Sequence, residues 1–493
     1  MEKTAAHTYC NPLSIPMIPR GKDDWYPFEK EMFSHENKPA SVTGPDYRSI
    51  SDPTVFYHDN KWYLYPSYGM AWVTEDFEHW KHVRTEPYCP KYSPSITRWK
   101  DRFLLVSWNN PLYVAADPLG PFELLGKFIG LDGETFVPCD PCIFTNDDGR
   151  IYMYAFLDEP IPGKSYHCST IVGYELDTED PRRVVRGPEL ILKMNPRDNW
   201  WERNGFYGED TSFCWVEGPH LLKHNGRYYM IYASPDTCNS AYVQGVYYSD
   251  KGPLEGFVQQ KKNPLTFHRE GIVAGAGHGC VEHGPNNTLW AFYTIATPSA
   301  HCFERRIGMD LVAVDENGEL YCPHGVTDTP QYIPGFVADP VGDGNSPGYL
   351  PIAKRWRPTA TSALPGRDSI YATDESPITW WEPDPADPLP TLTNNLKVPF
   401  LLGASRVFWH ESGLDYDKGH VPGPISYLIE GSIHNGPWFP LVDCRDAKED
   451  LNIDYRSFTP KTCDKVRITI TGAPAGIHPG VIDFTVFGVR DDR

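Results

Sequence analysis

Five segments of the chain repeat one order of polar and apolar positions. Each starts with a small or polar head, usually close to a proline, continues through mostly apolar residues and a polar turn, and ends in an aromatic strand. The heads are Asp52–Pro53, Ser93–Pro94, Asp140–Pro141, Glu217–Gly218–Pro219 and, in a degenerate copy, Gly277–His278. Repeated strand pairs of this kind are typical of radially stacked blades. If the innermost strands converge on one axis, the acidic heads and the histidine gather at the mouth of one central pocket.

The apolar runs are nearly continuous rather than alternating, which suits strands that neighbouring blades bury on both faces. The repeats fill residues 8–345 and predict a five-bladed β-propeller. A proline-rich stretch, 346–365, is interpreted as a linker. Residues 366–493 hold compact strands, such as 425–430 and 481–489, that indicate a jelly-roll-like β-sandwich. The chain is therefore predicted to be all-β with two domains, which its 493 residues also favour.

The composition favours a neutral ligand. A formal net charge of −20 argues against nucleic acid or an anionic membrane as a partner, and against a polyanionic substrate. The 15 Trp and 29 Tyr suit the C–H faces of a neutral sugar, although most aromatic side chains in a β-protein simply fill its cores. An insertion at 196–207, rich in polar and aromatic residues, forms either a pocket wall or a surface loop packed on itself.

The cysteines and the N-terminal residues exclude several functions. The 12 cysteines are scattered, so buried free thiols are expected rather than disulfides. Cys139 and Cys142 form a CxxC on a strand, which is a poor redox motif, and no second CxxC completes a zinc site. No apolar signal segment follows Met1, and no apolar run is long enough for a membrane span. We expect a cytoplasmic protein, or a secreted one if a signal segment has been trimmed from the sequence.

The acidic heads have the chemistry that glycoside hydrolysis needs: a proton donor to the leaving oxygen and a carboxylate acting on the other face of the sugar. One Asp-Pro alone usually caps the start of a strand. Three aligned acidic heads in five copies favour a shared site instead. Glu217 follows the apolar residues 213–216, so it is expected to be the acid with a raised pKa. The separation of the carboxyl groups decides between inversion and retention, and the sequence leaves both open.

These motifs resemble glycoside hydrolase family 43, a group of five-bladed β-propeller enzymes. The resemblance rests on Ser51–Asp52–Pro53, residues 140–144 and residues 216–219, and it covers about residues 8–340. It implies that Asp52 is the general base acting on water, that Asp140 orients and tunes the acid, and that Glu217 is the general acid. It further implies inversion at the anomeric carbon and release of α-L-arabinofuranose or β-D-xylose from plant-type glycans, with galactans as an alternative substrate. Exo action on the terminal sugar is expected because the inner strands converge on one axial depression, walled by aromatic insertions such as Trp200 and Trp201.

The resemblance also suggests further residues. His278 matches an axial histidine that helps hold a calcium ion in the central channel of many members, or else forms hydrogen bonds in the pocket floor. Arg306 is chosen as an arginine that points at the sugar or the base, with an outward salt-bridging arginine as the alternative. Aromatic side chains expected to contact the sugar are Trp72, Trp108, Trp200 and Trp201.

The C-terminal part resembles the discoidin, or coagulation-factor type C, sandwich of carbohydrate-binding families. Docking against the propeller and independent sugar binding are both open for it. Its segments add no acid that the propeller lacks, so we expect it to take no part in the chemistry.

Two other functions compete with this interpretation. The fructan hydrolases of families 32 and 68 need a different nucleophile segment, and here Ser51 precedes Asp52 while Gly218 follows Glu217. A catalytically silent, lectin-like propeller is the rival from another class. It would be favoured if one of the three acids were missing, and all three are present.

Overall fold

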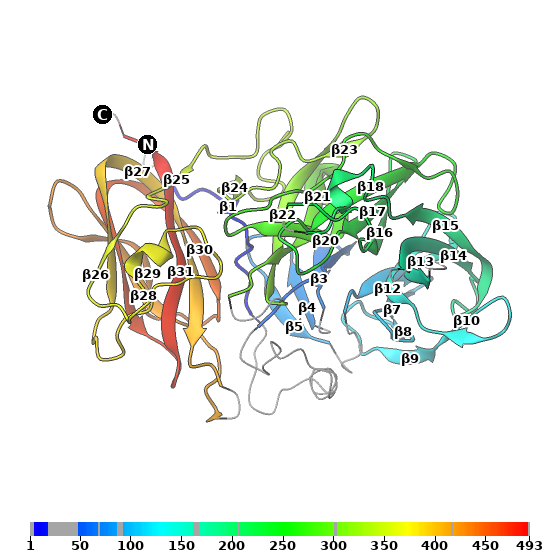
Figure 1. The fold of residues 1–493 in the computed structure, drawn as a ribbon, viewed down its shortest axis with the longest axis horizontal. Helices are drawn as coiled ribbons and strands as arrows, with labels where there is room; N and C mark the ends of the chain where they lie inside the picture. The colour runs from blue at the N-terminus through cyan, green and yellow to red at the C-terminus, as the bar shows by residue number, and fades with distance from the viewer. Residues whose placement is uncertain are drawn as a thin grey trace.

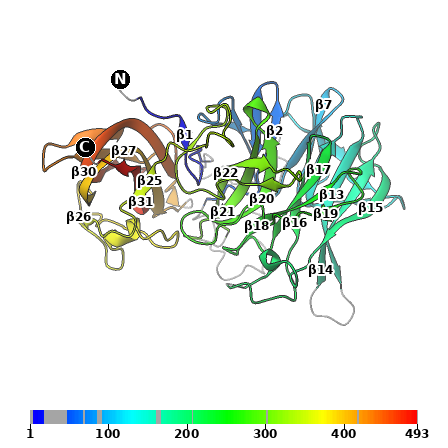
Figure 2. The same ribbon diagram turned by 90° about the horizontal axis from the view of Figure 1, so that it is seen from above.

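In a computed structural model, the regular secondary structure of the chain is almost entirely β-strand (Figures 1 and 2). The structure describes residues 4–17, 48–67, 70–85, 92–160, 167–205, 207–299, 303–415 and 418–491. Strands drawn from blue to green form one body, and strands drawn from yellow to red form a second body beside it (Figure 1). Among the described residues, no helix has the length and apolar character needed to cross a bilayer.

The first body consists of five four-stranded antiparallel sheets, each formed by consecutive strands. Blade one comprises β2 (Thr54–His58), β3 (Lys61–Tyr65), β4 (Met70–Thr74) and β5 (Lys81–Arg84). Blade two comprises β6 (Ser95–Trp99), β7 (Arg102–Val106), β8 (Leu112–Ala115) and β9 (Glu123–Gly126). Blade three comprises β12 (Cys139–Thr145), β13 (Ile151–Pro160), β14 (His167–Leu176) and β15 (Val184–Lys193). Blade four comprises β16 (Glu217–His224), β17 (Arg227–Ser234), β18 (Val243–Ser249) and β19 (Val258–Gln259), and blade five β20 (Ala274–His283), β21 (Leu289–Ala296), β22 (Arg305–Val314) and β23 (Leu320–Tyr321).

Short elements connect the blades. They are the hairpin of β10 (Phe128–Ile129) and β11 (Thr135–Phe136), and the 3-10 turn η1 (Trp200–Glu202). A second 3-10 turn, η2 (Pro285–Asn287), joins β20 to β21 within blade five. Near the N-terminus, β1 (Thr8–Tyr9) pairs with β24 (Gln331–Tyr332), which follows the last blade. The predicted all-β fold with a five-bladed propeller is confirmed.

The inner strand of every blade faces one axis. A cavity of about 730 Å³ is lined by residues of all five inner strands, among them Thr54, Ser95, Cys142, Leu221 and Val281. These inner edges have no strand to pair with, and side chains of the adjacent blade accept some of their backbone N–H groups. The amide of Val55 donates to Cys280 Sγ (3.1 Å), that of Ile143 to Ser95 Oγ (3.0 Å) and that of Leu221 to Cys142 Sγ (3.4 Å). The small polar residues of the repeat therefore join the blades to one another.

The cysteines of the described residues are free thiols, as expected from their spacing. Burial raises the pKa of Cys142 to about 11, and its sulfur is occupied by the Leu221 amide. This environment opposes thiolate formation, so the CxxC of β12 is a structural feature rather than a redox site.

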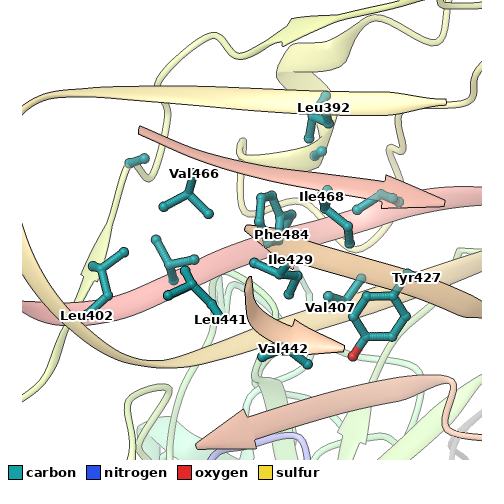
Figure 3. Close-up of a cluster of buried hydrophobic side chains, with 14 of the residues drawn as sticks. Leu392, Leu402, Val407, Tyr427, Ile429, Leu441, Val442, Val466, Ile468 and Phe484 are labelled. Carbon is teal, nitrogen blue, oxygen red and sulfur yellow. The ribbon is translucent and has the colours of Figure 1, made fainter. Parts of the chain in front are cut away.

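The second body is a seven-stranded antiparallel sheet built around two long strands. Its elements are β25 (Leu350–Ile352), β26 (Thr359–Ala360), η3 (Ser369–Ala372), β27 (Thr391–Ser412), β28 (Ser426–Ser432), β29 (Phe439–Cys444), β30 (Ile453–Gly472) and β31 (His478–Arg490). β27 pairs with β30 over most of its length and with β31 over its second half. Apolar side chains of β27 to β31 point into one buried cluster, shown in Figure 3. This strand-rich unit is called the sandwich below; its predicted discoidin-like identity stays a prediction.

The N-terminal segment and several loops join the propeller to the sandwich. Thr8 Oγ1 lies 2.7 Å from Tyr455 Oη, and Ser14 Oγ donates to the carbonyl of Ile453 (2.9 Å). Ile272 of the propeller packs in one apolar cluster with Phe408 and Ile482 of the sandwich, among other residues. The contact between the two bodies is therefore partly apolar and partly hydrogen-bonded.

Candidate active site

The head of each inner strand has an unusual backbone conformation. The φ angle is 51° at Asp52, 49° at Ser93, 43° at Asp140, 52° at Gly218 and 32° at His278. Positive φ is uncommon for residues other than glycine, and such residues gather at functional sites. In the inner strands β12, β16 and β20 the register shifts at this point, which marks a β-bulge. A bulge changes the direction of a side chain at the end of a strand. Here it lies at the head of the inner strand in blades three, four and five.

The heads are linked by contacts around the axis. Ser67 Oγ donates to Asp52 Oδ2 (2.6 Å) and accepts from the amide of Ser93 (3.1 Å). Ser93 Oγ donates in turn to Asp140 Oδ1 (2.8 Å), which also accepts the backbone N–H of Gly218. His278 Nδ1 lies 3.5 Å from Asp52 Oδ1 and brings the chain of contacts back to the first blade. The structure therefore brings the heads of all five blades together.

The structure corrects the alignment of the fourth head. Sequence comparison placed Glu217 level with Asp52 and Asp140, but the residue with the matching backbone conformation is Gly218. A proline follows the heads of the first four blades, and Pro219 in blade four marks Gly218 as the matching position. Glu217 stands one residue earlier, where its Oε1 accepts a hydrogen bond from Tyr242 Oη (2.7 Å).

Gly218 is required where it stands. A β-carbon built on it would lie 2.5 Å from the His278 ring, at a positive φ of 52°. We expect Gly218→Ala to lower the free energy of unfolding by about 1–2 kcal/mol from the left-handed backbone and by about 1–3 kcal/mol more from overpacking. Gly226→Ala is the matched control, since Gly226 also has positive φ (83°) but open space around it. Denaturant unfolding measures both variants, and equal losses would show that the ring contact has no importance.

Asp52 is buried and surrounded by donors. Burial opposes its ionisation, but the charges of Arg305 and His278 together with hydrogen bonds from Ser67 and Ser51 lower its pKa below the ordinary value. Arg305 Nη1 lies 3.3 Å from Asp52 Oδ1, and Ser51 Oγ donates to Oδ2 (2.9 Å). Asp52 is therefore a carboxylate near neutral pH and can accept a proton from water.

The pKa values of Glu217 and Asp140 are raised, in contrast to that of Asp52. Burial and the negative charge of Asp140 raise the pKa of Glu217 to about 8, although the hydrogen bond from Tyr242 opposes this rise. Burial also raises the pKa of Asp140, and the negative charge of Asp52 raises it further. The charge of His278 and the hydrogen bond from Ser93 oppose this rise. Glu217 therefore keeps its proton at neutral pH and can donate it, while a charged carboxylate remains available at Asp52.

The structure corrects the choice of arginine. Arg306 was expected to point at the sugar or the base, but Arg305 is the one beside Asp52. The Arg306 guanidinium is buried on the other side, where it pairs with Glu304 and contacts Asn452 of the sandwich. Neighbouring side chains on a strand point to opposite faces, so an error of one residue reverses the direction.

The four predicted tryptophans have different surroundings. Trp72 is fully buried and its Nε1 donates to the carbonyl of Pro16 (2.7 Å), so its predicted sugar contact is wrong. Trp201 is also buried, with Nε1 donating to Tyr232 Oη (3.1 Å), which leaves it no face for a sugar. Both fill space between strands, as aromatic side chains in β-proteins usually do.

The other two tryptophans remain accessible. Trp108 is half-buried and its indole bonds the thiol of Cys139, the residue before Asp140. Trp200 is 45% exposed and packs edge-on against Phe267, with ring centroids 5.1 Å apart. The insertion that carries Trp200 packs against blade four, where the buried Glu202 accepts from Tyr232. Sugar contacts of Trp108 and Trp200 stay predictions, and Trp108 is the one close to the acids.

The donor set around His278 does not fit a calcium ion held by protein ligands. Calcium prefers six to eight oxygen ligands, and His278 offers one nitrogen next to the carboxylate of Asp52. Within the part of the chain that the structure describes, no three His, Cys, Asp or Glu side chains converge where they could hold a metal ion.

Sequence reasoning missed several residues that hold the acids. Tyr242 bonds Glu217, Ser67 bonds Asp52, and Thr294 Oγ1 accepts from the amide of Asp52 (2.8 Å). Ser67 and Thr294 lie on other strands or loops than the heads, and a tyrosine or serine has no distinguishing pattern in one sequence. Arg305 directly precedes the predicted Arg306 in the sequence, so only the direction of the two side chains separates them.

Comparison with known proteins gives a family match over the propeller. The profile of the family described as "Glycosyl hydrolases family 43" matches residues 33–320. A "Xylosidase/arabinosidase" of Butyrivibrio fibrisolvens is 27% identical over 184 residues, which cover 36% of this chain and 32% of that protein. A "Beta-xylosidase" of Xylanibacter ruminicola is 24% identical over 312 residues, covering 51% of this chain and 93% of that protein.

The chain thus spans about a third of the length of the Butyrivibrio relative. Among solved structures, one described as a thermostable family-43 glycoside hydrolase has a TM-score of 0.48 at 23% identity. That similarity covers 58% of this chain and 96% of the other chain.

Proposed function

Since this chain belongs to the glycosyl hydrolases of family 43, we propose that it is an exo-acting glycoside hydrolase that releases one terminal neutral sugar with inversion. Glu217 is the general acid that protonates the leaving oxygen. Asp52 is the general base that takes a proton from the attacking water. Asp140 lies beside both and holds the pKa of Glu217 high through its charge.

The observation that carries this proposal is that two buried carboxyl groups of one cluster have opposite surroundings: Asp52 is next to Arg305 and His278, whereas Glu217 accepts from the neutral Tyr242. The pKa of Asp52 is lowered by Arg305 and His278 against the effect of burial, and that of Glu217 is raised to about 8. An acid and a base that are both in the correct protonation state at neutral pH are what the reaction requires. A lectin-like propeller has no need for such a pair.

The proposed substrate is a terminal α-L-arabinofuranose or β-D-xylose. The printed names of the relatives, xylosidase/arabinosidase and beta-xylosidase, support this choice. The formal charge of −20 supports a neutral rather than an anionic sugar. Trp108, close to Cys139 and Asp140, offers an aromatic surface for its C–H face.

A panel of aryl glycosides tests this function. We expect turnover of 4-nitrophenyl α-L-arabinofuranoside or β-D-xyloside, and release of monosaccharide alone from a linear oligosaccharide from the first minutes. An exo-acting pocket admits only the terminal sugar, whereas an open groove admits the chain interior. Early mixed oligomers would contradict exo action, and no cleavage of any glycoside would contradict the enzyme itself.

A further inference from the structure

Two consecutive arginines at the start of β22 link the candidate base to the sandwich. In the antiparallel pair with β21, Arg305 lies opposite Ala296 and Arg306 opposite Ile295. The side chain of Arg305 reaches Asp52 Oδ1 (3.3 Å) and Thr237 Oγ1 (2.5 Å). The side chain of Arg306 leaves the other face of the strand toward the sandwich. The chain thus joins a residue of the site directly to a residue of the domain interface.

Arg306 ties together two segments of the site. Its Nη1 donates to the carbonyl of Arg48 (2.7 Å) and to the carbonyl of Arg305 (2.8 Å). Its Nε donates to Asn452 Oδ1 (3.1 Å), a residue of the sandwich. Asn452 is itself fixed, since its Nδ2 donates to the carbonyl of Trp409 (3.0 Å) and its carbonyl accepts from the Trp409 amide (2.9 Å).

The segment that leads to Asp52 also contacts the backbone of Arg305 and the sandwich. The amide of Ile50 donates to the carbonyl of Arg305 (3.0 Å). The Arg48 guanidinium donates to Glu411 Oε2 (3.0 Å) and to Asp450 Oδ1 (3.1 Å), both on the sandwich. The sandwich therefore contacts both segments, the one that ends in Asp52 and the one that carries Arg305.

We propose that Asn452 is a positioning residue for the candidate base: by holding Arg306 it fixes the carbonyls of Arg48 and Arg305, and with them the contact between Arg305 and Asp52. This inference rests on the proposed function, in which Asp52 activates water. It reverses the expectation from the sequence that the sandwich takes no part in the chemistry.

The contact at stake is sensitive to small shifts. At 3.3 Å, the Arg305–Asp52 distance is at the long end for a charged hydrogen bond, so a further displacement of a few tenths of an ångström takes the pair beyond hydrogen-bond distance. Arg306 is buried, and a buried guanidinium that loses an acceptor must move or find another partner. With the ion pair to Glu304 as its remaining charged contact, Arg306 is expected to shift and to weaken its hydrogen bonds to the two carbonyls. The backbone that aims Arg305 at Asp52 is then less firmly fixed, the contact between the two side chains weakens, and the pKa of Asp52 rises.

The test compares two substitutions at the same domain interface. Asn452→Leu removes the acceptor for Arg306 and keeps the branched shape of the side chain, and Asn452→Asp keeps an oxygen acceptor there. Thr8→Val is the matched control, because it deletes a buried hydrogen bond between the propeller and the sandwich, to Tyr455, that has no link to Arg305. The measurements are kcat and KM over the pH range, the midpoint of thermal unfolding, and the infrared titration of the Asp52 carboxyl, identified by subtracting the Asp52→Asn protein.

We expect Asn452→Leu to lower kcat by about 10- to 100-fold, the loss that a shift of about 1 Å in a reacting group produces. The acidic limb of its pH profile and the titration of Asp52 should move up by about one unit, because a nearby positive charge is lost. Asn452→Asp should restore most of kcat. Thr8→Val should lower the unfolding midpoint without moving either pKa.

Two results would overturn the positioning role. One is an Asn452→Leu protein with the original kcat and pH profile. The other is an equal shift in Thr8→Val, which would mean that any loosening of the interface has this effect. If the unsubstituted protein turns over no glycoside, the proposed function fails, yet the infrared titration of Asp52 in these variants still decides whether Asn452 acts on it.

Discussion

Replacing Glu217 by glutamine is expected to lower kcat by about 10²- to 10⁴-fold on substrates with a poor leaving group, the usual contribution of general acid catalysis. The loss should be much smaller on aryl glycosides with an acidic phenol, since that leaving group departs without a proton. The pKa of Glu217, raised by burial and by Asp140 to about 8, also sets the alkaline limb of the pH–rate profile. Activity should fall as the pH rises through this value because the acid loses its proton, and the variant should lack this limb.

Glu202→Gln is the matched control for that substitution. Glu202 is another buried glutamate next to blade four, and burial raises its pKa too, but it accepts from Tyr232 and Asn199 and does not contact the strand heads. Steady-state kinetics with a series of phenols measures both variants. An equal loss in Glu217→Gln on all leaving groups would show that Glu217 is not the proton donor.

Replacing Asp52 by asparagine is expected to lower kcat by about 10²- to 10⁴-fold on every leaving group, because water must be activated whichever bond is broken. The lowered pKa of Asp52 places the acidic limb of the profile below the ordinary range of a carboxyl group. Activity falls there as the pH drops through that pKa and the base takes up a proton. The variant should lose this limb along with its rate.

Asp310→Asn is the control for the loss of a buried carboxyl group in the propeller. Asp310 accepts from Tyr293, Thr327 and Asn11 in blade five, and burial raises its pKa to about 7. Its substitution should change stability and leave kcat of the folded protein intact. An Asp52→Asn protein with the original kcat would make the assignment of the base wrong.

The repeat of polar heads and aromatic strands is sufficient to predict most of the fold. Inner strands buried on both faces need continuous apolar runs, and a head before proline marks where each one begins, so both features are written in local sequence. The same heads placed Asp52, Asp140 and His278 correctly around one axis. The alignment of the fourth head was wrong by one position. It matched the Glu217 carboxylate to Asp52 and Asp140, whereas the proline and the positive φ match Gly218 to them.

What the sequence did not predict depends on contacts between distant segments. The sequence around Trp72 does not show that its side chain is buried, because the carbonyl that accepts its hydrogen bond belongs to the distant Pro16. Choosing Arg305 instead of Arg306 requires the direction of each side chain on β22, which depends on the register with β21. The contacts of Asn452 and Asp450 with the arginines of the propeller join residues more than 140 positions apart, and no local pattern indicates them.

The anomer that the enzyme releases first tests the central assignment most directly. If Asp52 activates water while Glu217 protonates the leaving oxygen, the water attacks the face opposite the leaving group and the product has inverted configuration. Proton NMR during the first minutes of hydrolysis of a β-D-xyloside should therefore show α-D-xylose before mutarotation, or β-L-arabinofuranose from an α-L-arabinofuranoside. Initial release of the retained anomer would mean that a carboxylate attacks the sugar itself, and would contradict the role of Asp52 as a base.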